Sequence, residues 1–360
     1  MARHDFSRFT GMSSVSEQRI TVLIPGIFSV PSEAGKEDST SPSLPPNLTT
    51  LLTRSNQAAA GPSGFELRLF GLFGVAPPLD GDLPVAPVTR LADMGVIDRE
   101  WWVRADPVYL EPGHDSLVLH AGLNLTQSEA DSLAGEINAV LAADGWLLKT
   151  PRPERWYLKL PRAALIRTTV LSAAVGHDIH ALLPDGAERQ GWHTRLSELQ
   201  ILLHTSAVNA GREARGHRPA NSVWFWGGGL LPQLGTVGWT QVWSDEPLAS
   251  GLARLAGLPA APLPEDAREW LDQTSAGGDS LLVLDQLAVL QLQGDSLGCE
   301  PVIQALDRDW IGPLMAAVHA GQLASLTLLS DTGPVFRYQR VHRWRFWRRR
   351  FALSGRQEAA

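Results

Sequence analysis

VNAGREARGHRPANSVWFWGGGLLP, which spans residues 208–232, carries the strongest structural signal in the chain. Its β-branched and aromatic run at residues 223–226 stops at three glycines, which predicts a buried strand that leads into a tight turn. Glycines at the carboxyl end of a strand let backbone N–H groups approach an anion, and the planar guanidinium of Arg212 suits phosphate or carboxylate. An ordinary turn beside a solvated basic face would account for the same residues, so anion binding is one of two interpretations.

On both sides of this stretch, short apolar segments alternate with segments of helical pattern. The predicted strands are residues 19–24, 240–243, 280–284 and 323–329, and the predicted helices are residues 47–52, 248–256, 264–274 and 302–318. Strands that alternate with helices are typical of an α/β fold in which helices cover both faces of a mostly parallel sheet.

Between residues 96 and 167 the pattern changes to that of a smaller α+β unit. Strands are predicted at residues 101–102, 108–109, 116–120 and 156–160, and a helix at residues 128–142 begins where Thr126 and Glu129 have capping-box spacing. We therefore expect a flexible N-terminus (1–18), a discontinuous core domain (19–95 and 216–335), an inserted α+β domain (96–215) and a C-terminal segment (336–360).

Composition sets the outer limits on class and compartment. The 360 residues include 38 acidic and 31 basic ones, for a net charge of −7, and a single cysteine excludes an internal disulfide framework and a cysteine-based zinc site. No apolar run approaches the roughly 20 residues that span a bilayer, and the first residues lack the apolar core of a signal peptide. These features predict a soluble cytoplasmic protein.

The order and spacing of the 208–229 block resemble a block of the archaeal-type, cofactor-independent phosphoglycerate mutases, which belong to the alkaline phosphatase superfamily. VN-x-x-R-x-x-x-G-x-x-PAN-x-VWFWG-x-G corresponds there to HPVN…PAN-x-IWLWG-x-G. Weaker likenesses follow in the same order along the chain: PPNLTTLL from Pro45 to TPNLDRLA, residues 65–75 to the segment carrying LAILGY, WWVRAD from Trp101 to the region carrying AFRCN, and GDSLGCEPVIQALDRDWIGPL from Gly294 to GD…IGPLL. The likeness covers nearly the whole chain after Arg19. It implies an alkaline-phosphatase-like sheet flanked by helices with an inserted α+β domain, and the chain looks closer to a bacterial branch of regulatory proteins.

The resemblance also implies a chemistry that the sequence does not match. In the family, two divalent metals at the carboxyl ends of the sheet activate a serine that takes the phosphoryl group, and such a site needs several carboxylates and imidazoles. The position of the first aspartate is Pro25, and Ser63 lies near the position of the nucleophile. The family's D-E-A-G-H aligns with residues 288–292, and its last D-H pair with residues 331–332. Of these ligand positions only Asp331 keeps a carboxylate, because the others are Ala288, Leu292 and Thr332.

The anion-binding half of the family's site looks better preserved. Arg104, Asn209 and Arg212 match the family's motifs residue for residue, and Asp178 and His180 resemble a D-P-H segment. The same block contributes three further candidates: Asn221, Gly227 and Gly229. Helix capping and a scaffold ion pair would equally explain Asn209 and Arg212, and loop histidines are the alternative for His180.

We therefore expect a phosphoglycerate-mutase-like protein without catalysis, which is regulatory or binds a phosphorylated small molecule or a protein partner and needs no cofactor. The first alternative is an active mutase or phosphohydrolase, an intramolecular phosphotransferase with divergent ligands for Mn²⁺, Mg²⁺ or Zn²⁺. The second alternative is a nucleic-acid-associated protein that uses the C-terminal arginines.

The C-terminus combines aromatic and basic residues. Residues 336–347 read FRYQRVHRWRFW, whose period of two predicts a strand, and seven arginines lie between Arg337 and Arg350. Such a segment can bind nucleic acid, acidic partners or a membrane surface. We favour the alternative that the aromatic side chains pack on the body of the protein, with the arginines solvated or paired, because the overall charge is negative and no nucleic-acid module surrounds the segment.

Overall fold

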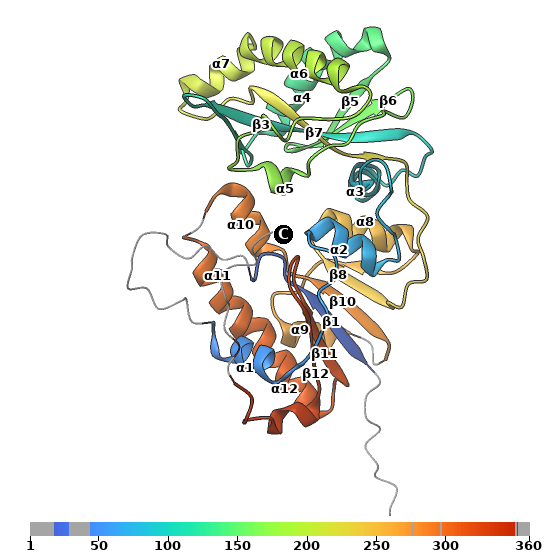
Figure 1. The fold of residues 1–360 in the computed structure, drawn as a ribbon, viewed down its shortest axis with the longest axis vertical. Coiled ribbons are helices and arrows are strands. Elements are labelled where there is room, and N and C mark those ends of the chain that lie inside the picture. The colour runs from blue at the N-terminus through green and yellow to red at the C-terminus, as the bar shows by residue number, and fades with distance from the viewer. Residues whose placement is uncertain (1–17, 29–43, 275–276, 296, 350, 352–360) are drawn as a thin grey trace, which may run out of the picture.

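In a computed structural model, the chain forms two sheets that lie one above the other, with helices between them and on their outer sides (Figure 1). The structure describes residues 18–28, 44–274, 277–295, 297–349 and 351. The predictions for residues 1–17, 350 and 352–360 lie outside this range.

The larger sheet has seven strands in the order β2-β12-β11-β1-β10-β8-β9. The bounds are Arg19–Leu23 (β1), Asn56–Ala58 (β2), Gln241–Ser244 (β8), Ala260–Ala261 (β9), Asp279–Val283 (β10), Ser325–Leu329 (β11) and Val335–Tyr338 (β12). Strands β11, β1, β10, β8 and β9 pair in parallel, whereas β12 and β2 form an antiparallel edge. The predicted mostly parallel α/β sheet is confirmed.

Helices cover both faces of this sheet because its central strands carry apolar side chains on both faces. In β1, Ile20 and Val22 belong to the core on one side, and Leu23 belongs to the core on the other side. The helices on the first side are α1 (Pro46–Arg54), α9 (Ala267–Gln273), α11 (Cys299–Leu306) and α12 (Gly312–Ala320). Those on the second side are α2 (Phe65–Leu72), α3 (Val85–Met94) and α8 (Pro247–Leu255), and α10 (Gln286–Gln293) lies beyond the carboxyl end of β10.

The single helix predicted for residues 302–318 is two helices joined by a π-helical turn at Asp307–Ile311. Asp307 is buried there, and its carboxylate accepts the backbone N–H of Leu48 at 2.6 Å and the amide of Asn47 at 3.0 Å. Pro313 has no N–H to donate in the first turn of α12. The bonds of Asp307 and the missing N–H of Pro313 both favour the π-helical turn between α11 and α12. Asp307 also caps the N-terminus of α1, which has no capping side chain in its own sequence.

The smaller sheet is antiparallel and is built around one long strand, β3 (Trp101–Pro112). Its other strands are β4 (Leu117–His120), β5 (Leu147–Arg152), β6 (Arg155–Leu160) and β7 (Ser222–Gly229). Helices α4 (Gln127–Leu141), α6 (Arg189–His204) and α7 (Ala207–Ala214) lie on the outer side, and the short α5 (Leu171–Ala174) faces the larger sheet (Figure 1). The predicted capping box is confirmed, since Thr126 and Glu129 exchange side-chain to backbone hydrogen bonds at 2.9 and 3.2 Å.

Strand β7 differs from its sequence-based description in two respects. It pairs with β3 in the smaller sheet, although residues 216–335 were assigned to the core domain. It also runs through the glycines rather than ending before them, because Gly228 and Gly229 leave room for neighbours that a side chain would meet: a Cβ would lie 2.4 Å from the Trp101 ring and 2.7 Å from Pro84, respectively.

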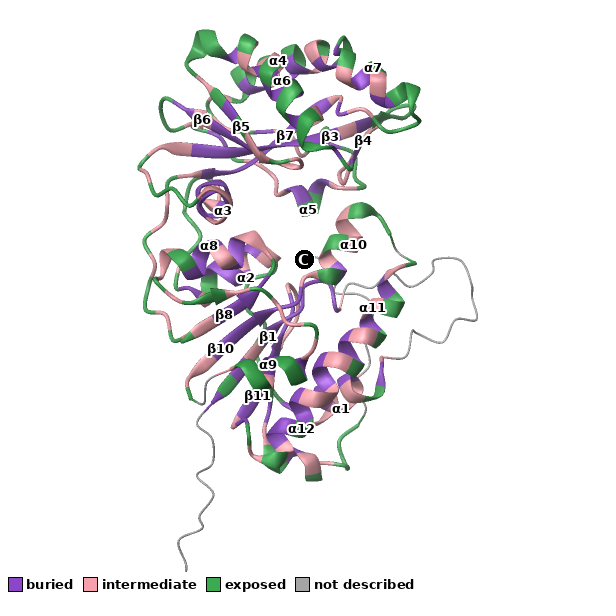
Figure 2. Cartoon of the chain, turned by 180° about the vertical axis from the view of Figure 1, so that it is seen from behind, coloured by how far each residue is buried: buried purple, intermediate pink, exposed green. Residues whose placement is uncertain are grey.

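Helix α3 connects the two halves (Figure 1). It packs against β7 on one side and against α8 on the other, where Arg254 donates to the carbonyl of Leu91 at 2.9 Å. Buried residues run continuously through both sheets and α3, and the exposed ones concentrate on the outer helices (Figure 2). No helix within the described ranges is both long and apolar enough to cross a lipid bilayer.

Candidate functional site

The carboxyl ends of β1 and β11 bring together three segments that are far apart in the sequence. Asp331 follows β11, and its Oδ1 atom accepts the backbone N–H of Gly26 at 2.8 Å. The carbonyl of Asp331 accepts the backbone N–H of Gly64, also at 2.8 Å. Pro25 and Ser63 directly precede these two glycines, so they lie beside Asp331 as the family resemblance implies.

Helix α10 closes the same edge. The Nε2 atom of Gln291 lies 3.4 Å from the carbonyl of Gly26, and Ala288 and Leu292 are on the same helix. Leu292 packs into the apolar cluster between the sheets. On the other side, Ser330 donates its hydroxyl to Oδ1 of Asp331 at 2.6 Å, directly before Thr332.

Three further carboxyl groups surround this edge, and sequence reasoning missed them because the resemblance assigns them no role. Burial raises the pKa of Glu66 on α2, against a hydrogen bond from Ser172, and Asp331 raises it further. Burial also raises the pKa of Asp285, which follows β10. Burial raises the pKa of Glu246, the N-cap of α8, to about 7, and the charges of Asp285 and Glu66 add to this shift. The pKa values of all three carboxyl groups are therefore shifted upwards at this edge.

Glu246 predicts a pH dependence of stability. The pKa of Glu246 in the folded chain, about 7, exceeds its ordinary value of 4.5, so the folded chain binds this proton more tightly than the unfolded chain does. The resulting stability is present below about pH 4.5 and is lost as the pH rises through 7. We expect the melting temperature to fall from pH 5 to pH 8, and Glu246→Gln to flatten the decline because glutamine keeps the acceptor for Ala249 without titrating. Thermal melts between pH 5 and pH 8 measure this dependence.

Glu300→Gln, at an exposed position, is the control for this prediction. If the melting temperature falls equally with pH in the unmodified chain, Glu246→Gln and Glu300→Gln, the assignment to Glu246 is contradicted.

Within residues 18–28, 44–274, 277–295, 297–349 and 351, no three or more His, Cys, Asp or Glu side chains are grouped so that they could hold a metal ion. The ligand positions implied by the resemblance are occupied at this edge by Pro25, Ala288, Leu292 and Thr332, beside the carboxylate of Asp331. Among these five described residues, Asp331 alone carries a carboxylate or an imidazole.

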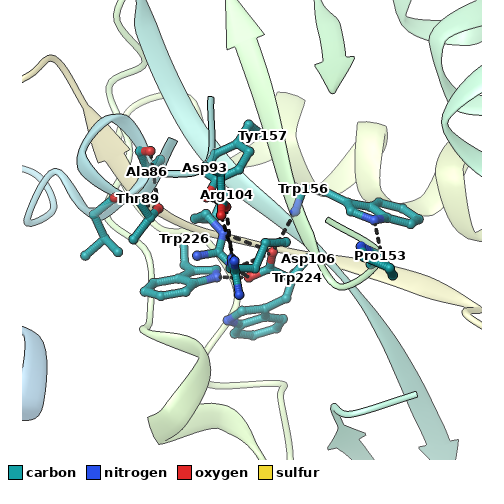
Figure 3. Close-up of polar contacts among 12 residues, drawn as sticks. Ala86, Thr89, Asp93, Arg104, Asp106, Pro153, Trp156, Tyr157, Trp224 and Trp226 are labelled. Atoms are coloured by element: carbon teal, nitrogen blue, oxygen red, sulfur yellow. Dashed lines mark hydrogen bonds and ion pairs between the residues drawn. The ribbon is translucent and has the colours of Figure 1, made fainter. Parts of the chain in front are cut away.

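Arg104 lies on the face of the smaller sheet that is turned towards α3, in a buried polar network (Figure 3). Its neighbours across the sheet are Tyr157 on β6 and Trp226 on β7, whose rings lie 5.3 and 5.0 Å from the guanidinium carbon. Asp106, two residues further along the same face, binds the guanidinium through Nε and Nη2 at 2.7 to 3.0 Å. The charge of Arg104 is thus compensated within its own strand.

Asp93 of α3 ties this network to the helix that joins the two halves. Its carboxylate accepts two hydrogen bonds from Arg155, at 2.7 and 2.9 Å, and one from the Tyr157 hydroxyl at 2.6 Å. Burial raises the pKa of Asp93, but these hydrogen bonds outweigh burial and leave the pKa below its usual value. Burial and the neighbouring carboxylate raise the pKa of Tyr157, so it remains a hydrogen-bond donor.

Asn209 and Arg212 are on α7, which lies on the side of the smaller sheet that faces away from the larger sheet (Figure 1). The amide of Asn209 bonds to the carbonyls of Leu203 and Ala220 and to the N–H of Ala220, each at 2.9 Å. The buried guanidinium of Arg212 bonds to Glu129, Leu123 and Arg218, at 2.8, 2.6 and 3.0 Å. These contacts favour the scaffold interpretation of both residues over the anion-binding one.

The glycines at the end of β7 lie beside a carboxylate of the protein itself, that of Asp82. The N–H of Gly227, at φ 65°, donates to the Thr168 hydroxyl at 3.1 Å, and the N–H of Gly228 donates to Oδ2 of Asp82 at 3.3 Å. Thr168 donates to Asp82 through both its backbone N–H and its hydroxyl. Gly229 follows in the same strand and packs on Pro84. Because the Thr168 hydroxyl and the Asp82 carboxylate accept hydrogen bonds from these two amides, they do not form an open anion cradle.

The remaining candidates make local contacts. Asn221 forms a pair of hydrogen bonds with the backbone of Leu110, at 2.8 and 2.9 Å, where β7 begins beside β3. Asp178 accepts the N–H of Leu117 at 2.9 Å and contacts Nδ1 of His180 at 2.7 Å, and both side chains are exposed. His180 also borders a surface pocket formed with α6.

Comparisons with known proteins agree with the resemblance over part of the chain. No family model matches. A curated protein, 2,3-bisphosphoglycerate-independent phosphoglycerate mutase 2 of Methanothermobacter thermautotrophicus, is 26% identical over 168 residues, which are 41% of this chain and only 42% of that relative. Among solved structures, the PH0037 protein of Pyrococcus horikoshii matches over 90% of this chain and 88% of its own, with a TM-score of 0.53 and 14% identity. A cofactor-independent phosphoglycerate mutase of Thermoplasma acidophilum matches over 90% of each chain with a TM-score of 0.43 and 17% identity. The chain is similar in sequence to the cofactor-independent phosphoglycerate mutases and shares its fold with PH0037.

Proposed function

We propose that this chain is a phosphoglycerate-mutase-like protein that does not carry out metal-dependent phosphoryl transfer and acts instead by binding a ligand or partner, as a regulatory protein does. The observation that carries the proposal is the bonding of Asp331. Its Oδ1 atom accepts both the Gly26 N–H and the Ser330 hydroxyl, at the strand ends where the related enzymes would hold their metals. A carboxylate oxygen that joins the carboxyl ends of β1 and β11 in this way is a structural acceptor.

The side chains around Asp331 support the same conclusion. Two-metal phosphoryl transfer requires several deprotonated carboxylates and neutral imidazoles held within a few ångströms. The side chains of Pro25, Ala288 and Leu292 offer no ligand atom at this edge.

A phosphorylated small molecule is the ligand that we propose for this edge, and Arg68 is the residue that we propose to bind it. Arg68 on α2 is buried, and its Nη2 donates to the carbonyl of Gly333. Its Nε atom has no hydrogen-bond partner among the described residues. Burial lowers the pKa of Arg68, and the charge of nearby Asp331 acts in the opposite direction. An anionic ligand would supply the missing acceptor.

The catalytic half of the proposal has a direct test. Purified chain with Mn²⁺ or Mg²⁺ is expected to show no interconversion of 2- and 3-phosphoglycerate above the rate without protein, and Asp331→Asn is expected to behave identically. An authentic cofactor-independent mutase assayed in parallel serves as the positive control. Metal-dependent turnover that Asp331→Asn abolishes would refute the proposal.

The binding half is measured separately, by thermal shift and calorimetry with 3-phosphoglycerate and with inorganic phosphate. A ligand that binds only the folded chain raises the melting temperature, and Arg68→Gln should remove this increase. Arg99→Gln, at an exposed position between α3 and β3, should leave the increase unchanged. Equal shifts in both variants would exclude Arg68 from the binding site.

A further inference from the structure

Four large apolar side chains near the C-terminus lie in solvent. Strand β12 buries Phe336 and Tyr338, as expected for aromatic residues that pack on the body of the protein. The chain then leaves the sheet, and a 3₁₀ helix at Arg340–Trp344 replaces the strand predicted for residues 339–347. The exposed fractions there are 66% for Val341, 61% for Trp344, 76% for Phe346 and 69% for Trp347. The expectation that Phe336, Tyr338, Trp344 and Phe346 pack on the body of the protein is therefore wrong for Trp344 and Phe346.

The 3₁₀ helix sorts its side chains into two neighbouring stripes. With three residues per turn, side chains at i and i+3 lie one above the other. Val341 and Trp344 therefore share one side, and Arg340 and Arg343 share the next, while the buried His342 faces the protein. An apolar stripe beside a cationic stripe is the arrangement of a segment that binds an interface between water and lipid.

The positive charge of this region is not compensated within the described chain. Seven arginines surround the turn, and no ion pair with a described Asp or Glu involves any of them: Arg54, Arg337, Arg340, Arg343, Arg345, Arg348 and Arg349. Burial lowers the pKa of His342, and the charges of Arg345 and Arg348 lower it further. The chain as a whole carries a net charge of −7, so this face differs in sign from the rest of the molecule.

Hydrogen bonds fix the turn against α1 and β2. Arg54 donates to the carbonyl of Arg343 at 2.7 Å, and Arg345 donates to the side chain of Asn56 at 2.6 Å. Phe351 packs on Phe336 with ring centroids 5.4 Å apart. A groove beside the turn is lined by Thr53, Asn56, Gln57, Arg348 and Arg349. The face is thus preorganised, and its groove offers guanidinium, hydroxyl and amide donors to a phosphate group.

We propose that this basic–aromatic face, made of Val341, Trp344, Phe346 and Trp347 with the seven arginines, docks on an anionic membrane surface. The aromatic and aliphatic side chains enter the headgroup region, and the arginines bind lipid phosphates. Stable attachment of a protein to a membrane surface requires two contributions, and this face offers both: apolar side chains and a cluster of positive charge.

The ring geometry favours lipid over nucleic acid. Bases stack on aromatic rings whose faces are free. The Arg343 guanidinium lies 4.8 Å from the centroid of the Trp344 ring, and Phe346 and Trp347 meet edge to face at 5.4 Å and 81°. Val341 would gain nothing from phosphate or base contacts, whereas it gains from an apolar phase.

The test is co-sedimentation of the full chain with vesicles of phosphatidylglycerol and phosphatidylcholine, and with vesicles of phosphatidylcholine alone. We expect binding to the anionic vesicles only, and a steep loss of binding as salt is added. Trp344→Ser/Trp347→Ser and Arg340→Ser/Arg349→Ser should each weaken this binding by about tenfold or more. These four side chains donate no hydrogen bond in the described structure, so the variants should fold, which circular dichroism checks.

Matched variants away from this face are the controls. Ile201→Ser, at a position on α6 that is 70% exposed, and Arg99→Ser should bind anionic vesicles like the unmodified chain. Absence of binding to anionic vesicles at low salt would overturn the proposal. Tighter binding to a single-stranded oligonucleotide in fluorescence anisotropy, lost in the same two double variants, would also overturn it and assign the face to nucleic acid.

Discussion

Replacing Asp106 with alanine is expected to lower the free energy of unfolding by about 3–5 kcal/mol, because the change leaves the buried guanidinium of Arg104 without its counter-charge. Arg104 and Asp106 are 5% and 1% exposed, so water cannot take over the lost contacts. The Nε1 atom of Trp226, which donates to Asp106 at 2.7 Å, and the N–H of Trp156, which donates at 3.1 Å, would lose the same acceptor. Denaturation by urea at neutral pH measures the effect.

Two further variants show whether the buried charge is the cause. Asp279→Ala removes the partner of Arg19 in an ion pair whose arginine side chain is 55% exposed, and it should change stability by only about 0–1 kcal/mol. The double variant Arg104→Met/Asp106→Leu removes both charges and should be more stable than Asp106→Ala, since apolar side chains of similar size can replace a buried ion pair. A loss below about 1 kcal/mol in Asp106→Ala would mean that water or a rearranged side chain reaches Arg104.

The features that the sequence predicts correctly are those set by local physics. The capping box at Thr126 depends on a residue only three positions away. Short β-branched runs, such as residues 19–24, predict the parallel strands. Asp106 could also have been found, because a residue two positions from Arg104 in a strand shares its face.

The features that the sequence does not reveal depend on partners far along the chain. The glycines of β7 pack against Pro84 and Trp101, more than 120 residues earlier, so their role as sites of close approach is not visible in their own neighbourhood. Asp82 accepts a hydrogen bond from the Gly228 amide, which the glycine pattern assigns to a ligand. The C-terminal turn leaves the sheet after Tyr338, and a period of two alone cannot show where pairing with β11 ends.

Gly251→Ala is the second change with a large expected effect, and the reason is the close packing of α8 against α3. A Cβ at this position would lie 2.2 Å from the carbonyl oxygen of Val88 and 2.9 Å from its Cγ1 atom. The carbonyl belongs to the backbone of a helix and cannot rotate away, so the two helices would have to separate. Overpacking of a buried contact costs about 1–3 kcal/mol, and we expect a loss near the upper end, measured by urea denaturation.

Gly135→Ala on α4 is the matched control. A Cβ there meets nothing within 4 Å, so the same substitution should stabilise the chain by about 0.5–1 kcal/mol through the lower entropy of the unfolded state. The two variants differ only in what the new methyl group meets, and equal effects would show that α3 does not rest on α8 as described.

Separation of α3 from α8 should also change the contacts between α3 and the smaller sheet. Helix α3 carries Arg90, whose guanidinium lies 4.3 Å from the centroid of the Trp102 ring, and Asp93, which holds Arg155 and Tyr157. A shift of α3 in Gly251→Ala would therefore alter the surroundings of Trp102 and change the near-ultraviolet circular dichroism of the folded chain. A variant that loses stability with an unchanged spectrum would place the strain within α8 itself, and the two halves would then be mechanically independent of this contact.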